Sequence, residues 1–133
     1  MAPYLYISGG VNFNEETSEN EESDKFFALR KQRSKILELI NLPQMIDSKS
    51  HHCMLEVKYL EGICAIGGTD SKDCEYYNFK NKEWKNLPDL NDIRENCSCC
   101  VVNEKYLYCF CGYNNQTCKF YVNIERLYLK KKR

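Results

Sequence analysis

Short apolar runs separated by polar turns are the main pattern along this chain. Three β-prone runs end in glycine, namely PYLYISGGVNF (3–13), LEGICAIGGTD (60–70) and KYLYCFCGYNN (105–115). The polar segments Lys80-Asn81-Lys82 and Asn103-Glu104 lie between apolar runs and are typical of tight turns. The pattern therefore predicts an all-β protein made of antiparallel hairpins.

Part of the pattern repeats with a shift of 45 positions. The shift places Leu39 on Trp84, Pro43 on Pro88, Met45 on Leu90, Lys49 on Arg94 and Gly67 on Gly112. Five features aligned by one shift indicate an internal repeat, and each repeat unit reads as four short antiparallel strands.

One segment allows two interpretations. The sequence FFALRKQRSKILELINL (26–42) has apolar residues at 26, 29, 36, 37 and 40, which partly fits an amphipathic helix. The repeat instead predicts a hairpin in which 26–30 turns through 32–34 into 35–40. We favour the hairpin, because the repeat is defined by residues outside this segment.

The second unit resembles the kelch repeat, whose units are the blades of a β-propeller. The resemblance is carried by Gly67, Gly68, Tyr77, Trp84, Pro88, Arg94 and Gly112, in the kelch order and spacing. It implies a partial kelch-type β-propeller with four-stranded antiparallel blades, open or completed by other chains or missing sequence. Tyr77 and Trp84 are expected to seal one blade against the next, and Arg94 to satisfy carbonyl groups at the blade boundary.

The resemblance is strong only from about 63 to 112. In the first unit Gln32, Leu39 and Lys49 replace the tyrosine, tryptophan and arginine, and Cys111 replaces the first glycine of the second pair. We divide the single domain 1–133 into a partial blade end (1–14), an acidic loop insertion (15–25), a degenerate blade (26–68), a well-matched blade (69–112), and a partial blade with a basic tail (113–133).

Composition narrows the class of protein. The 19 basic and 19 acidic residues cancel, which gives no electrostatic reason to expect nucleic acid as a partner. No apolar run reaches the ~20 residues needed to span a bilayer, and the N-terminus lacks the features of a secretory signal. We therefore expect a cytoplasmic protein, with the cytoskeleton as a site of association, and free thiols for most of its nine cysteines.

The cysteines are the main candidates for chemistry. A zinc site is the alternative for the cluster Cys97, Cys99, Cys100, Cys109, Cys111 and Cys118, with 97, 99, 109 and 111 expected on one face of paired strands. Against it, C-x-C spacing on extended strands is expected to hold the sulfurs too far apart, so we favour core thiols and predict no metal and no cofactor. Some kelch-like propellers are copper radical oxidases, but His51 and His52 are adjacent and would point to opposite faces of a strand.

The expected function is a non-catalytic protein–protein interaction or scaffold module within a larger assembly. The residues expected to contact a protein partner lie in loops at the blade ends: Asp70, Lys72, Asn91, Asp92 and Tyr113. The acidic segment is expected to be solvated, with docking of a basic partner as the alternative. No small-molecule ligand is expected. Two alternatives stay open: a thiol-rich zinc protein or small metalloenzyme, and a ubiquitin-ligase adaptor, whose usual domain before the propeller we do not find.

Overall fold

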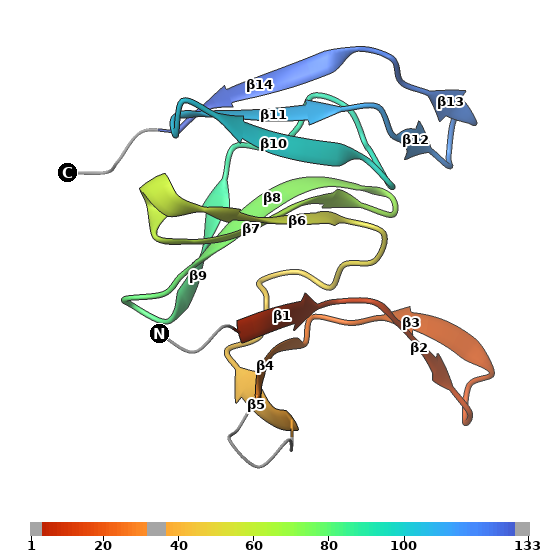
Figure 1. Cartoon of the computed structure of the whole chain (residues 1–133). Coiled ribbons are helices and arrows are strands. Elements are labelled where there is room, and N and C mark those ends of the chain that lie inside the picture. The colour runs from red at the N-terminus through yellow and green to blue at the C-terminus, as the bar shows by residue number, and fades with distance from the viewer. Residues whose placement is uncertain (1–3, 32–36, 130–133) are drawn as a thin grey trace.

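The computed structural model describes residues 4–31 and 37–129. The body of this part of the chain is a stack of three antiparallel sheets that lie face to face, with two small hairpins beside it (Figure 1). The prediction of an all-β protein is confirmed. One 3-10 turn, η1 (Lys58–Leu60), interrupts the strands. Among the described residues, no helix is long and apolar enough to cross a membrane.

The N-terminal sheet has the strand order β1-β4-β5. Its strands are β1 (Tyr4–Ser8), β4 (Phe26–Lys31) and β5 (Leu37–Leu42). The pairing of Phe26 with Leu42 and of Leu29 with Leu39 shows that 26–42 forms a hairpin, so the helical alternative is wrong. The predicted turn at 32–34 lies outside the described residues.

The central sheet has four strands in the order β6-β7-β8-β9. They are β6 (Cys53–Val57), β7 (Gly62–Gly68), β8 (Ser71–Asn78) and β9 (Glu83–Leu87). Every residue of β7 is buried, because this strand has neighbours on both edges and a sheet on both faces. The central sheet thus takes β6 and β7 from the segment 26–68 and β8 and β9 from the segment 69–112, so each sheet boundary lies in a linker and not at a glycine pair.

The C-terminal sheet has the order β10-β11-β14. It comprises β10 (Ser98–Val102), β11 (Tyr106–Phe110) and β14 (Ile124–Tyr128). The predicted turn at Asn103-Glu104 joins β10 to β11, and both residues have positive φ, as the tightest hairpin turns require.

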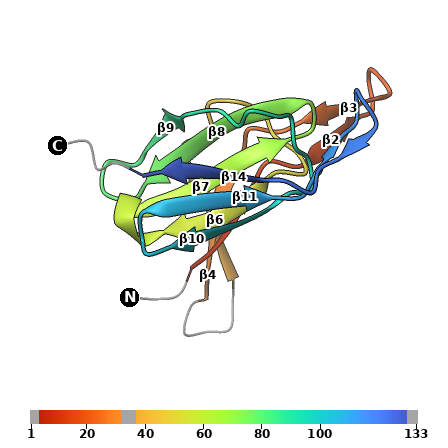
Figure 2. The ribbon, with the colours of Figure 1, turned by 90° about the horizontal axis from the view of Figure 1, so that it is seen from above.

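Two further hairpins project from the same end of the stack (Figures 1 and 2). The first pairs β2 (Val11–Asn14) with β3 (Glu19–Glu22), and the second pairs β12 (Tyr113–Asn114) with β13 (Lys119–Phe120). The acidic segment 15–25, expected as a loop, thus includes a strand. A strand forms there because β2 offers Val11 to Asn14 as a pairing edge.

The apolar core lies between the sheets. Phe26, Ile63 and Tyr77 form the cluster between the N-terminal and central sheets. The larger cluster, between the central and C-terminal sheets, is built around Val57, Cys64, Ile66, Cys74, Leu90, Cys97, Leu107, Cys109 and Leu129. Each sheet is thus stabilised mainly by burial against its neighbour.

Candidate functional site: the linker end of the sheets

Two segments carry the chain from one sheet to the next, and both cross at the same end of the stack. The first linker is 43–52, between β5 and β6, and the second linker is 88–97, between β9 and β10. In each linker an apolar residue, Met45 or Leu90, is buried. Its backbone N–H donates at 2.8 Å to the part of the chain that the linker leaves behind, Met45 to Asp24 O just before β4 and Leu90 to Lys72 O in β8. The repeat seen in the sequence is therefore a repeat of linker geometry.

A glutamate on the third strand of the following sheet fastens each linker. The backbone N–H groups of Ile46 and Asp47 donate to the two carboxylate oxygens of Glu75, at 2.7 and 3.4 Å. The N–H groups of Asn91 and Asp92 donate in the same way to Glu125, at 2.6 and 3.3 Å. Charge-assisted bonds of this kind hold a linker more firmly than bonds between neutral groups.

A buried cation completes each contact. Lys49 Nζ lies 3.8 Å from Glu75 Oε1, and Arg94 Nε donates to Glu125 Oε1 at 2.9 Å. Arg94 is fully buried, and its other nitrogens donate to Cys111 O and Asn123 Oδ1, both at 2.6 Å. We call each set of linker amides, cation and glutamate a linker lock. The second lock makes shorter contacts than the first.

Burial works against the carboxylate of the first lock. Desolvation raises the pKa of Glu75, while the Ile46 amide and the charge of Lys49 act in the opposite direction. Its partner Lys49 is fully buried and also donates to Asp73 O at 3.4 Å. Each charge of this pair thus compensates the hydration that the other has lost. A buried ion pair is tolerated only when its charges are compensated in this way.

Sequence reasoning identified the cation of each lock but missed both glutamates. Lys49 and Arg94 are 45 positions apart, whereas Glu75 and Glu125 are 50 apart. The β12–β13 hairpin lies before β14 and adds residues that the two-residue turn between β7 and β8 lacks. A search that allowed an insertion after each glycine pair would have aligned the two acids.

Trp84 closes the interface between the N-terminal and central sheets. Its ring lies 5.0 Å from that of Phe26 and 5.5 Å from that of Tyr77, measured between centroids. Its indole Nε1 donates to Pro43 O at 2.9 Å, so the side chain holds the start of the first linker as well as the core.

We expect Trp84→Phe to lower the free energy of unfolding by about 1 kcal/mol, because the ring contacts persist while the bond to the Pro43 carbonyl is lost. Urea denaturation followed by circular dichroism measures this, since the variant removes the only tryptophan. Tyr76→Phe, in the neighbouring strand β8 and on the opposite face of the sheet, is the matched control. Equal stability of Trp84→Phe and the natural chain would show that the indole bond contributes nothing.

The five residues expected to bind a partner lie at or near the linker end, in different settings. Asp70 is exposed in the turn between β7 and β8, whereas Lys72 lies within β8, because the expected loop 69–73 is only two residues long. Asn91 uses its side-chain amide on Glu125 at 2.9 Å, and Asp92 lies 3.8 Å from Arg94 Nη2. Tyr113 stacks on Phe120, with centroids 4.7 Å apart. Asn91 and Asp92 thus belong to the second linker lock.

Exposed apolar side chains missed by sequence reasoning lie on the two projecting hairpins. Phe13 on β2 is 63% exposed and Phe120 on β13 is 77% exposed. The first hairpin is tied to its linker by the Ser50 hydroxyl, which donates to Glu22. Both hairpins therefore present an aromatic ring at the linker end, one of them among carboxylates.

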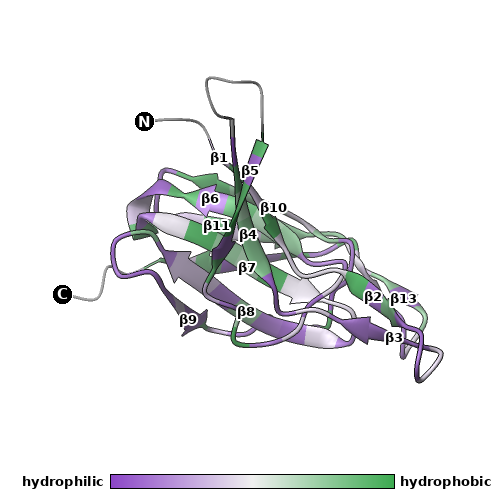
Figure 3. Cartoon of the chain, turned by 90° about the horizontal axis from the view of Figure 1, so that it is seen from below, coloured by the Kyte–Doolittle hydropathy of each residue, from purple (hydrophilic) through white to green (hydrophobic). Residues whose placement is uncertain are grey.

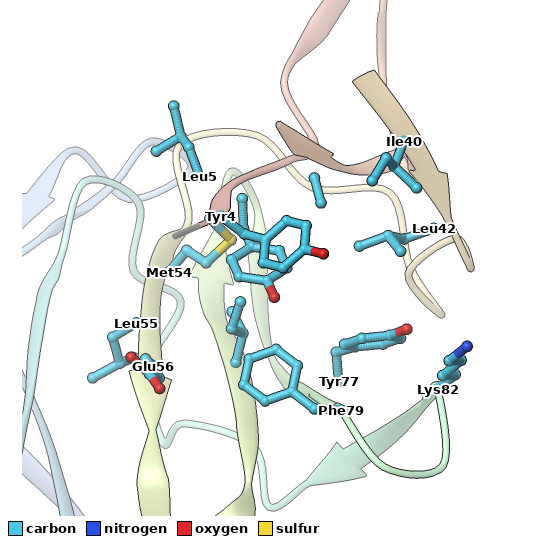
Figure 4. A pocket seen from close by; sticks show the side chains of 13 residues that line it. Tyr4, Leu5, Ile40, Leu42, Met54, Leu55, Glu56, Tyr77, Phe79 and Lys82 are labelled. Carbon is cyan, nitrogen blue, oxygen red and sulfur yellow. The ribbon is translucent and has the colours of Figure 1, made fainter. Parts of the chain in front are cut away.

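A groove of about 810 Å³ opens between the N-terminal and central sheets at the other end of the stack (Figure 4). Ile40 and Leu42 of β5 line one wall, and Tyr77 and Phe79 line the other. The two sheets diverge here. The groove is mostly apolar, and Lys82 and Glu56 at its rim are the charged residues that line it.

The outer face of the N-terminal sheet is apolar, and none of the residues that the structure describes covers it. Cross-strand pairing places Leu5, Leu29 and Leu39 in one row and Ile7 beside Phe27 in the next. Leu5 is 63% exposed and Leu39 is 57% exposed. Seen from below, this sheet lies in front of the central sheet with green residues along its strands (Figure 3). A row of leucines in water is unfavourable unless another surface covers it.

The thiols are distributed differently from the expectation. Cys97, Cys99 and Cys109 do converge, with sulfurs within 4.8 Å of one another, so the expectation that extended strands keep them apart is wrong. Cys111 does not join them: it is exposed, at φ 60°, where its carbonyl accepts from Arg94. Cys100 and Cys118 are exposed.

Comparison with known proteins gives one distant similarity. No protein-family model matches the chain. The chain is 29% identical over 112 residues to the Kelch repeat and BTB domain-containing protein 2 of Ectromelia virus (strain Moscow). The match covers 81% of this chain but only 18% of that protein. A likeness to kelch repeats is thus supported by a relative and by the residue pattern together.

Proposed function

We propose that this chain is a non-catalytic protein-interaction module in which each sheet is a kelch-type propeller blade, acting as a subunit or part of a larger assembly. The observation that carries the proposal is the linker lock, which recurs at two successive sheet interfaces with equivalent backbone amides donating to a glutamate and a buried cation beside it. Repeated units that bind only their neighbours are typical of propellers and other repeat proteins. The distant kelch relative supports the same interpretation.

The uncovered outer face of the N-terminal sheet supports the part of the proposal that concerns assembly. Within the stack, the equivalent face of the central sheet is covered by its neighbour, and Tyr77 and Trp84 are packed there. Leu29 and Leu39 occupy the corresponding positions of the N-terminal sheet. We infer that a further blade, from the same polypeptide or from another chain, covers this face.

The inferred blade would bind in a different way from the two interfaces that the structure shows. In the N-terminal sheet Phe27 pairs with Ile7, and in the central sheet Glu75 pairs with Ala65. Phe27 therefore occupies the position at which the linker lock has its glutamate. A linker arriving at this face finds no carboxylate at that position. Binding there would depend on the burial of apolar side chains. Such burial is strongly favourable, but it fixes the alignment of the two sheets less specifically than a buried charge does.

We place the binding surface for an external protein at the linker end, around Asp70, Lys72 and Tyr113. The projecting hairpins support this placement, because they expose Phe13 and Phe120 at the same end of the stack. Exposed aromatic rings are frequent anchors of protein interfaces. The carboxylates of β3 would favour a basic partner. The role requires no cofactor, nucleic acid or small-molecule ligand, and fits a cytoplasmic protein.

Native mass spectrometry of the purified chain over a range of concentrations tests the proposal. We expect association beyond the monomer, because burying the leucine row gains free energy at about 25 cal/mol per Å². The double variant Leu5→Lys/Leu39→Lys should return the chain to a monomer. Phe13→Lys/Phe120→Lys changes two equally exposed apolar residues away from this face and should leave association unchanged.

A chain that stays monomeric at every concentration, and is no more soluble after the leucine substitutions, would contradict the proposal. Loss of association in the phenylalanine variant instead of the leucine variant would also contradict it. In that case the interface would lie on the hairpins.

A further inference from the structure

Three cysteines converge at the second interface, and a fourth begins a strand of the neighbouring sheet that packs against them. Cys53 begins β6 of the central sheet, and Cys97 ends the second linker. Cys99 in β10 pairs directly with Cys109 in β11. Strands β6 and β10 pack against each other, which brings the first cysteine to the other three.

The sulfur positions are close to those of a metal site. The Sγ atoms of Cys97, Cys99 and Cys109 all lie within 4.8 Å of one another. A tetrahedral zinc with Zn–S bonds of about 2.3 Å holds its sulfurs about 3.8 Å apart. Small side-chain rotations close this difference. The thiol of Cys53 interacts with that of Cys99 but lies outside the set of three sulfurs, so its side chain must turn toward them to become the fourth ligand.

We propose that Cys53, Cys97, Cys99 and Cys109 bind one Zn²⁺ as a structural four-thiolate site. Soft thiolate ligands in a tetrahedral set select zinc over calcium and magnesium. Binding forms four Zn–S bonds and releases the thiol protons to solvent. The ion would join the innermost strands of the central and C-terminal sheets. The linker lock joins the same sheets further out.

Among residues 4–31 and 37–129 the first interface has no such group of thiols, which makes the cluster a feature of one interface and not of the fold. The shift of 45 positions places His52 on Cys97 and Met54 on Cys99, and the strand register places Ala65 on Cys109. There, the Ser8 hydroxyl contacts His52 Nε2 and Met54 Sδ at 2.8 and 3.0 Å. Hydrogen bonds fill the space that the thiols occupy in the second interface. The inference does not depend on the proposed function.

The test is titration of the reduced, metal-free chain with Co²⁺ and then Zn²⁺. We expect one equivalent of Co²⁺ to produce the thiolate charge-transfer band and the intense visible bands of a tetrahedral site. One equivalent of Zn²⁺ should abolish them. Elemental analysis of the chain purified with zinc should give one zinc per chain.

Variants separate the cluster from the other cysteines. Cys109→Ala installs the residue that the central sheet carries at this position, and Cys53→Ser changes a partly exposed thiol, so circular dichroism should show both still folded. Each should weaken metal binding at least about 100-fold, more than the loss of an outer hydrogen bond does. Cys100→Ser, on the opposite face of β10, should change nothing.

A folded chain that gives no tetrahedral cobalt spectrum would overturn the inference. Cobalt bands that survive both cluster substitutions would do the same, as would bands lost with Cys100→Ser.

Discussion

Replacing Arg94 by methionine is expected to lower the free energy of unfolding by about 3 to 5 kcal/mol, the usual cost of removing one partner of a buried ion pair. The guanidinium is fully buried and bonds to Glu125, Cys111 O and Asn123. It also lies over the Tyr121 ring, 4.6 Å from its centroid. Methionine fills most of the volume but leaves the Glu125 carboxylate without its cation and the Cys111 carbonyl without the guanidinium donor. Urea denaturation measures the loss.

Two further variants show where the effect comes from. Arg94→Lys keeps the charge but cannot reproduce the planar fork, so it should recover only part of the loss. Lys85→Met removes an exposed cation whose ion pair with Glu83 is 4.0 Å long, and it should change stability by less than about 1 kcal/mol. If Arg94→Met were as mild as Lys85→Met, the second linker lock would have no energetic role.

The second large effect is expected at Gly67, where alanine should cost about 2 to 4 kcal/mol through backbone strain and overlap. Gly67 has φ 64°, and a Cβ there would lie 2.5 Å from Arg94 O. This carbonyl cannot move freely, because it accepts the N–H of Gly68 at 2.9 Å. The substitution would therefore push the second linker away from the central sheet.

Gly10→Ala is the matched control, measured by the same thermal and urea unfolding. It also has positive φ, 105°, but a Cβ there meets nothing within 4 Å. The control should show the strain alone, about 1 to 2 kcal/mol. If both variants lost the same stability, close approach to the linker would not be the reason for glycine at 67.

The sequence alone determined the β class and most strand positions. Alternating β-prone runs and polar turns are local signals, and the hairpins at 26–42, 74–87 and 98–110 follow from them. The shift of 45 positions also located the cation of each linker lock, since Lys49 and Arg94 lie in linkers of equal length.

Only the tertiary structure decided which distant residues meet. The shift of 45 positions did not align Glu75 with Glu125, because an inserted hairpin changes their spacing. The linker amides that donate hydrogen bonds to them come from another part of the chain. Cys53 comes next to Cys99 in the cluster because two sheets stack, whereas Cys111 turns outward at a left-handed residue. Sequence patterns report which side of its own strand a residue occupies. Which residues that side contacts depends on how the sheets pack, and local sequence patterns do not determine the packing of sheets.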